Sequence, residues 1–367
     1  MSDLWGDTRW LALWLLCSAC GSENTASPEA GSGDAITHHL ATSATHSCAI
    51  RDDGLYCWGR NASGELGDGS TTDSTSAVRA QDVGDDVVEV GTQTSRTCVR
   101  RTSGEIACWG ANSAGQIGDG TRTATMTATA AQGISDAHQL AVDDNSTCVV
   151  HGAEHAVSCW GESSSLKPDS GSLVPSQIAG LTGIQQLRVG AFASYCALTA
   201  GGEVLCFRAE EGRWSTPKKA DLPKVKTIAM PHSDYVCGLP DSGGILCQSI
   251  VDATRVELPD STGALALEAG SGGLVLCANY PGQTWRCWNL PSFTLPMMGV
   301  DNVAGQFPFQ VYSDVPAREL AIAGFRVCVL REDDSIACVD SAAEAEHAAS
   351  LISQMRIELT VPVAGLP

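Results

Sequence analysis

The residues best suited to chemistry are two histidines and a glutamate near the middle of the chain. The H-G-A-E-H run at residues 151–155 matches H-x-x-E-H, a zinc-protease motif that needs a helix to place both histidines on one face. Here the run lies between Cys148 and Cys159 and contains a glycine at its second position, which favours a hairpin turn over a helix. We therefore interpret the run as a polar turn, and we expect neither a zinc site nor catalytic residues in this chain.

Two Gly-Asp-Gly runs, at residues 67–69 and 118–120, are the second candidate for a cation site. They resemble fragments of calcium-binding loops, but they lack the series of carboxylates and the terminal glutamate of a complete loop. His38, His39 and His46 gather near the first expected strand, where surface or hairpin roles are favoured over a metal site. The sequence predicts no metal and no cofactor.

Sixteen cysteines form the strongest pattern in the sequence, and two of them, Cys17 and Cys20, lie in the N-terminal segment. The other fourteen fall into seven pairs whose members are 9 to 11 residues apart. The first members of successive pairs advance by 40 to 51 residues. The pairs are Cys48 and Cys57, Cys98 and Cys108, Cys148 and Cys159, Cys196 and Cys206, Cys237 and Cys247, Cys277 and Cys287, and Cys328 and Cys338.

Each pair brackets an expected β-hairpin. Most of the intervening segments carry a glycine or an acidic turn, such as Asp53-Gly54 or Ser103-Gly104, and short apolar runs flank them. Opposed residues on neighbouring strands lie about 4.5–5.5 Å apart at Cα, which overlaps the range of about 4.4–6.8 Å that a disulfide tolerates. Zinc sites usually need Cys-x(2–4)-Cys spacing, so this pattern favours seven structural disulfides and an oxidising compartment.

Seven similar units predict an all-β fold, a seven-bladed β-propeller with one disulfide-pinned hairpin per blade. Without the first 35 residues or so, the chain of 367 residues leaves roughly 47 residues per unit, which matches one four-stranded blade. The formal net charge of −20 argues against a nucleic-acid partner and against attraction to anionic lipids. We expect a monomeric body over residues 36–367.

The N-terminal residues 1–20 have the pattern of an export signal. Arg9 precedes a short apolar run at residues 10–16 that is too short to span a bilayer as a helix. The L-C-S-A-C run ending at Cys20 resembles a bacterial lipoprotein cleavage box, and this resemblance implies that Cys20 carries a lipid at the mature N-terminus. Gly21 follows Cys20, so the resemblance implies no inner-membrane retention signal and an outer-membrane or surface location. A cleaved secretory signal without lipid and an uncleaved start are the alternatives.

The polar residues 21–35 form an expected flexible tether between this anchor and the propeller. No other stretch reaches the length of a membrane span, so the membrane is expected as a partner only through the lipid.

A sequence pattern that starts at the second cysteine of a pair recurs in the first three units. Residues 57–69 and 108–120 both follow the pattern C-W-G-x-N-x-x-G-[EQ]-[LI]-G-D-G, and residues 159–161 begin a third copy. This pattern resembles the repeats of the regulator of chromosome condensation family, whose members form seven-bladed propellers. The exported, cysteine-paired bacterial branch of that family is the most similar in pattern.

The resemblance leaves several functions open. The founding members of the family are nuclear guanine-nucleotide exchange factors, but no exchange-site residue can be placed in this sequence, and export conflicts with a nuclear role. We expect a non-catalytic, lipid-anchored binding module outside the cytoplasm that presents a propeller face to an unknown protein or surface glycan. A secreted protein inhibitor of an enzyme, similar to bacterial propellers that cap β-lactamases, is the first alternative. A hydrolase or lyase with its site in the central channel and, by family analogy, a guanine-nucleotide exchange activity are further alternatives.

The first prediction concerns the cysteines and the N-terminus together. Protein purified from its native membrane and alkylated without reduction should lack residues 1–19, carry a diacylglycerol-type mass on Cys20 and show no free thiols. The measurement is the intact mass. Alkylation of all fourteen paired cysteines on an unprocessed chain would instead place the protein in a reducing compartment and favour the cytoplasmic functions.

Overall fold

The computed structural model describes residues 39–161, 171–210, 213–232, 234–269, 275–282, 284–289, 317–323 and 326–340. All of them belong to the unit Ala35–Pro367. The predicted signal at residues 1–20 with Cys20, the tether at 21–35, His38 and the end of the chain lie outside the described residues. No helix among the described residues has the length and hydropathy of a membrane span.

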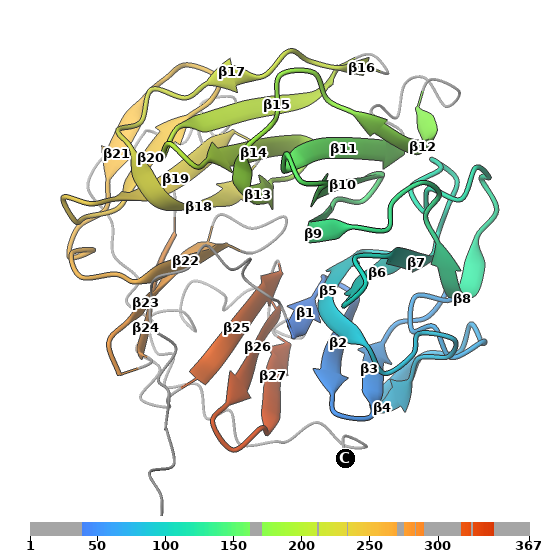
Figure 1. Cartoon of the computed structure of the whole chain (residues 1–367). Coiled ribbons are helices and arrows are strands. Elements are labelled where there is room, and N and C mark those ends of the chain that lie inside the picture. The colour runs from blue at the N-terminus through green and yellow to red at the C-terminus, as the bar shows by residue number, and fades with distance from the viewer. Residues whose placement is uncertain are drawn as a thin grey trace, which may run out of the picture. The chain divides into compact units, whose positions relative to one another are not determined.

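The described residues form seven antiparallel sheets arranged as the blades of a propeller (Figure 1). This confirms the predicted all-β, seven-bladed fold. The first three blades have four strands each, in chain order. Their strands are β1 (Leu40–Thr42), β2 (His46–Arg51), β3 (Gly54–Gly59) and β4 (Ser74–Arg79); β5 (Val87–Gln93), β6 (Arg96–Arg101), β7 (Ile106–Gly110) and β8 (Thr125–Ala130); β9 (Ala137–Val142), β10 (Ser146–His151), β11 (Ala156–Gly161) and β12 (Ser172–Gln177).

The remaining blades keep the same order with some variation. In the fourth blade two short outer strands, β16 and β17, both pair with β15, and the described parts of the sixth and seventh blades contain three strands each. The strands are β13 (Ile184–Val189), β14 (Ser194–Thr199), β15 (Val204–Glu210), β16 (Arg213–Trp214) and β17 (Lys218–Lys219); β18 (Val225–His232), β19 (Tyr235–Pro240), β20 (Leu246–Ser249) and β21 (Arg255–Glu257); β22 (Ala266–Ala269), β23 (Val275–Tyr280) and β24 (Thr284–Asn289); β25 (Ala317–Ala323), β26 (Arg326–Arg331) and β27 (Ile336–Asp340).

A disulfide joins the two middle strands of every blade, as the cysteine spacing predicts. The paired cysteines lie directly opposite each other in the strand register, and their Cα atoms are 3.9 to 4.1 Å apart. Residues of β6 and β10 are buried almost without interruption, because the neighbouring blades cover both faces of these strands. The outer strand β4 is instead rich in serine and threonine and is largely exposed, which suits the free edge of a sheet.

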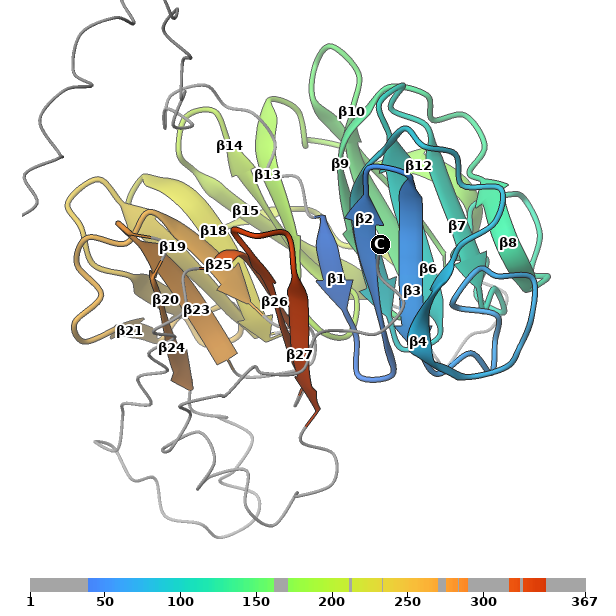
Figure 2. The ribbon, with the colours of Figure 1, turned by 90° about the horizontal axis from the view of Figure 1, so that it is seen from below.

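The antiparallel order gives the ring two different faces (Figure 2). One carries the loops that join the first to the second strand and the third to the fourth strand of each blade, such as residues 43–45 and 60–73. We call this the loop face. The other carries the middle hairpins and the connections between blades, such as residues 52–53 and 80–86, and we call it the hairpin face.

Side-chain oxygens on the innermost strands hold adjacent blades together. The innermost strand has a neighbour on one side only, so its backbone N–H groups on the free edge need other acceptors. Gln139 Oε1 accepts from the N–H of Leu187 in the next blade at 2.9 Å, and Gln186 Oε1 accepts from the N–H of Ile228 at 3.0 Å. Glu89 Oε1 similarly lies 3.3 Å from the N–H of Leu140.

The same device joins the seventh blade to the first. Glu319 on β25 accepts from the N–H groups of His39 and Leu40, at 3.1 and 3.0 Å. An apolar cluster continues this junction with Leu40, Ala49 and Trp58 from the first blade and Cys328, Leu330 and Ile336 from the seventh. The first blade uses strands from one continuous stretch of chain, and among the described residues the first and seventh blades meet through this packing and these hydrogen bonds.

The closing junction gives the second prediction. Replacing Glu319 with leucine leaves the N–H groups of His39 and Leu40 without their acceptor, so the free energy of unfolding should fall by roughly 1–3 kcal/mol. Glu319→Gln keeps one acceptor oxygen and should lose less. Urea unfolding with the disulfides intact measures both variants, and equal stability of the leucine variant and the parent would contradict this role of Glu319.

Candidate functional site

The Asn-Asp network of the repeated loop is occupied by the loop itself. Asn61 Oδ1 accepts from the N–H of Leu66 at 2.9 Å, and Asn61 Nδ2 donates to Asp68 at 3.1 Å. Asp68 Oδ1 also accepts from the backbone and hydroxyl of Ser70, at 3.0 and 2.9 Å. Asn112, Asp119 and Thr121 repeat this arrangement in the second blade. The Gly-Asp-Gly runs thus close a turn, and their carboxylates already have donors.

The tryptophan of the repeated pattern fastens each loop to the next blade. Trp109 Nε1 donates to the carbonyl of Glu65 in the first blade at 3.0 Å, and Trp160 Nε1 donates to the carbonyl of Gln116 at 3.0 Å. A Cβ at Gly67 would lie 2.6 Å from Trp109 Nε1, and the φ of Gly67 is +71°, so this position needs glycine. The tryptophan and this glycine of the repeated pattern therefore serve contacts between blades.

The H-x-x-E-H histidines lie in the β10–β11 hairpin and contact different partners. His151 Nε2 is 2.8 Å from Ser158 Oγ, and its Nδ1 is 3.6 Å from the Asp136 carboxylate. His155 stacks on His138 with ring centroids 4.6 Å apart. Among the described residues, no three His, Cys, Asp or Glu side chains gather as a metal site.

The other histidines singled out by the sequence also have structural contacts. His46 is fully buried, with Nδ1 at 3.1 Å from Ser43 Oγ and Nε2 at 2.8 Å from Thr97 Oγ1 of the second blade. His39 lies beside Glu319 at the closing junction, at 3.6 Å. Both therefore take part in contacts between blades.

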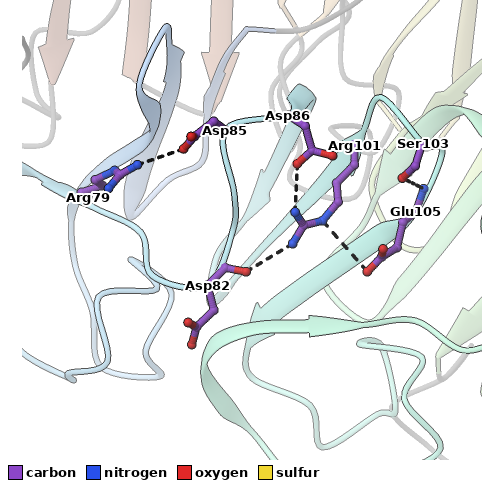
Figure 3. A network of polar contacts seen from close by, with 7 residues as sticks. All are labelled: Arg79, Asp82, Asp85, Asp86, Arg101, Ser103 and Glu105. Carbon is purple, nitrogen blue, oxygen red and sulfur yellow. Dashed lines mark hydrogen bonds and ion pairs between the residues drawn. The ribbon is translucent and has the colours of Figure 1, made fainter.

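The hairpin face carries a network of charged side chains between the first and second blades (Figure 3). Arg79 at the end of β4 pairs with Asp85 at 3.1 Å, and Arg101 at the end of β6 pairs with Asp86 at 2.9 Å. Arg101 also reaches the carbonyl of Asp82 at 3.2 Å. Exposed pairs of this kind contribute little to stability, so we interpret the network as fixing the course of the linker from β4 to β5.

The loop face has a buried polar centre beneath it, between the second and third blades. Arg96 is 1% exposed and donates to the carbonyls of Gln116 and Ser146, at 2.5 and 2.9 Å, and to that of Asp143. Burial lowers the pKa of Arg96 to about 10. These bonds tie the second blade to the first loop of the third blade, which contains Asp143.

Asp143 in turn holds a loop of the fourth blade. Its carboxylate accepts from the N–H of Ala193 at 3.0 Å. The loop places Phe192 and Ala193 at φ values of 56° and 51°, a left-handed conformation that residues other than glycine rarely adopt. Phe192 is 82% exposed, the highest exposure among the large apolar side chains of the described residues. An aromatic ring held in solvent on a strained loop is a candidate contact for a partner.

The sequence reasoning missed Phe192. The signal was present, because the corresponding loops of the first three blades carry polar residues, as in Thr94-Ser95 and Asp144-Asn145, whereas the fourth carries Gly-Ala-Phe-Ala at 190–193.

The innermost strands line a central cavity of about 150 Å³. Most of its lining is apolar or small, but it includes the charged residues Arg188 on β13 and Glu268 on β22. Among the described residues, the cavity lining contains one carboxylate, that of Glu268. The sequence reasoning missed both residues, since it assigned no side chain to the channel.

Asp143 gives the third prediction. Burial first, and then the neighbouring charge of Asp144, raise the pKa of Asp143 to about 6, against 3.8 for an ordinary aspartate. The folded protein therefore holds this proton more tightly than the unfolded chain does. The resulting stability is fully present below about pH 4 and is lost as the pH rises through about 6.

Asp143→Asn should remove this dependence while leaving an acceptor for Ala193. Between about pH 4 and pH 7 the free energy of unfolding of the parent should fall by about 2–3 kcal/mol relative to this variant. Urea unfolding at the two pH values measures the difference. Asp144→Asn should produce a smaller change in the same direction, and an unchanged pH slope in the Asp143 variant would refute the assignment.

Comparison with known proteins agrees with this architecture. A family model described as "Regulator of chromosome condensation (RCC1) repeat" matches residues 38–65. The E3 ubiquitin-protein ligase HERC2 of Homo sapiens is 27% identical over 206 residues, which are 52% of this chain and 4% of that protein. The ultraviolet-B receptor UVR8 of Arabidopsis thaliana is 29% identical over 175 residues, which are 45% of this chain and 40% of the receptor.

The fold has solved counterparts as well. Prp20p of Saccharomyces cerevisiae superposes with a TM-score of 0.61 at 14% sequence identity, covering 82% of this chain and 85% of Prp20p. The chain aligns with well under two thirds of HERC2 and UVR8, so the activities of those whole proteins are not transferred to it. The repeat match and the fold agree: the chain carries a repeat of the RCC1 type and a propeller fold like that of Prp20p.

Proposed function

We propose that this protein is a non-catalytic binding module that lies outside the cytoplasm and presents the loop face of its propeller to a protein partner. The observation that carries the proposal is Phe192, an aromatic side chain 82% exposed on a left-handed loop. A left-handed conformation costs such a residue about 1–2 kcal/mol, and backbone strain of this kind is concentrated at functional sites.

The contacts around Phe192 support a preformed binding surface. The loop is joined to the third blade by the bond from Ala193 to Asp143, and the third blade is joined to the second through Arg96. The loop that carries Phe192 is therefore fixed by contacts that involve the second, third and fourth blades. Preformed aromatic contacts lose little conformational entropy on binding, which suits recognition of a protein surface.

The cysteines support the proposed location outside the cytoplasm. Seven intrachain disulfides are consistent with an extracytoplasmic location, where such bonds persist. We propose that a lipid on Cys20 anchors the protein at the outer membrane or cell surface. A nucleotide-exchange role would need the cytoplasm, so disulfides disfavour it.

The fourth prediction tests the loop face. A photo-crosslinking amino acid in place of Phe192 should capture a specific protein on the native cell surface, and one in place of Leu265 should not. Leu265 is the matched control because it is also an exposed apolar residue, at 59%, but lies on the hairpin face between β21 and β22. Mass spectrometry identifies the captured partner.

Binding of that partner should then depend on Phe192. Phe192→Ala should weaken it at least tenfold, or about 1.4 kcal/mol, whereas Leu265→Ala should leave it unchanged. Phe192→Gly should weaken binding equally without lowering stability, because glycine tolerates the left-handed conformation. Capture only from position 265, or unaltered binding by Phe192→Ala, would refute the assignment of the face. Capture of a glycan would show that the partner is a glycan and not a protein. If the protein carries no lipid and inhibits a captured enzyme, the result would favour the secreted inhibitor.

A further inference from the structure

The central cavity has a layer of seven equivalent positions, one from each innermost strand. In every blade this position lies directly opposite the first cysteine in the strand register. Five of the seven residues are alanine or glycine, and the other two are Arg188 and Glu268. The full layer is Ala41, Gly91, Ala141, Arg188, Ala229, Glu268 and Ala321.

Crowding at the axis explains the small residues. A Cβ at Gly91 would lie 2.7 Å from Cγ2 of Val142 in the next blade, which is closer than real Cβ contacts. Packing alone therefore favours alanine or glycine in this layer. Arg188 in the fourth blade and Glu268 in the sixth blade are larger than this packing favours. One blade, the fifth, separates them.

Arg188 has unused hydrogen-bonding capacity. Its Nη1 donates to the carbonyl of Leu187 at 3.1 Å. Its Nη2 is buried and has no hydrogen-bond partner in the part of the chain that the structure describes. Buried polar atoms are normally hydrogen-bonded, and a guanidinium without a partner is costly, so this atom needs an explanation.

Glu268 supplies the complementary charge in the same cavity. Within the described ranges, its carboxylate and the Arg188 guanidinium do not approach each other closely enough to form an ion pair. The other described residues of the lining carry no charge. The cavity thus contains one fixed cation and one fixed anion, surrounded by small and apolar side chains, and neither charge neutralises the other by direct contact.

We propose that this cavity binds a small zwitterion of the α-amino acid class, with the carboxylate on Arg188 and the ammonium group toward Glu268. A simple anion would meet Arg188 but would also meet the negative charge of Glu268, and a simple cation has the converse problem. A zwitterion satisfies both groups, and charge-assisted bonds of this kind are the stronger ones. A dry cavity of about 150 Å³ in another protein accepts benzene, so the volume here suits a ligand with about six non-hydrogen atoms, such as alanine.

Isothermal titration calorimetry of the full, disulfide-bonded protein with L-alanine provides the fifth prediction. Saturable binding is expected, and Arg188→Gln and Glu268→Gln should each weaken it at least tenfold. Acetate and methylammonium, which each carry one of the two charges, should bind at least tenfold more weakly than alanine. The matched controls Arg213→Gln and Glu332→Gln, on exposed residues away from the channel, should leave the titration unchanged.

Circular dichroism and an unchanged urea midpoint establish that the channel variants remain folded. The proposal is overturned if L-alanine binds more weakly than about 1 mM, if acetate binds as well as alanine, or if the channel variants bind normally. Phe192→Ala should leave the titration unchanged, so the outcome is independent of the proposed loop-face partner.

Discussion

The free edge of each innermost strand is the constraint on which this ring depends. These strands pair with a neighbouring strand on one side only. The backbone N–H groups on their free edge face the crowded axis of the ring. Gln139, Gln186 and Glu319 answer this need by accepting backbone protons from the following blade. At these junctions one blade completes the hydrogen bonding of its neighbour, and the last of these bonds forms only when the seventh blade meets the first.

Bonds within a blade and bonds between blades have different roles. The disulfide forms its covalent bond within one blade, although its sulfurs also pack against a neighbouring blade, as Cys328 does at the junction with the first blade. The bond from Trp109 to the carbonyl of Glu65 does the opposite, since it joins a strand of the second blade to a loop of the first. A blade with its disulfide alone would leave both faces of its middle strands in water. Stability of the ring must therefore come from the junctions as much as from the cross-links.

Most of the fold could be predicted from the sequence, because the cysteine spacing marks each pair of middle strands directly. The candidate site could not be predicted in the same way. Arg188 and Glu268 are recognised only once the inner strands are aligned with the cysteines, and the connecting loops make that spacing vary from seven to nine residues. A shift of one residue would place either side chain on the other face of its strand. Phe192 depends likewise on a backbone conformation that its neighbours in sequence do not specify.

The distribution of the repeated pattern explains where new surfaces can arise. The tryptophans of the first three blades pack against a neighbouring blade, and in the first two blades the asparagine of the pattern bonds within its own loop, so those residues are not available to a ligand. In the fourth blade Phe207 stands where the tryptophan would be, and it packs with Tyr195 and Trp214 instead. Phe192 and Arg188 belong to this same blade. A local aromatic cluster takes the place of the shared contact in this blade, and the loop that carries Phe192 at a left-handed φ is held instead by the buried Asp143 of the third blade.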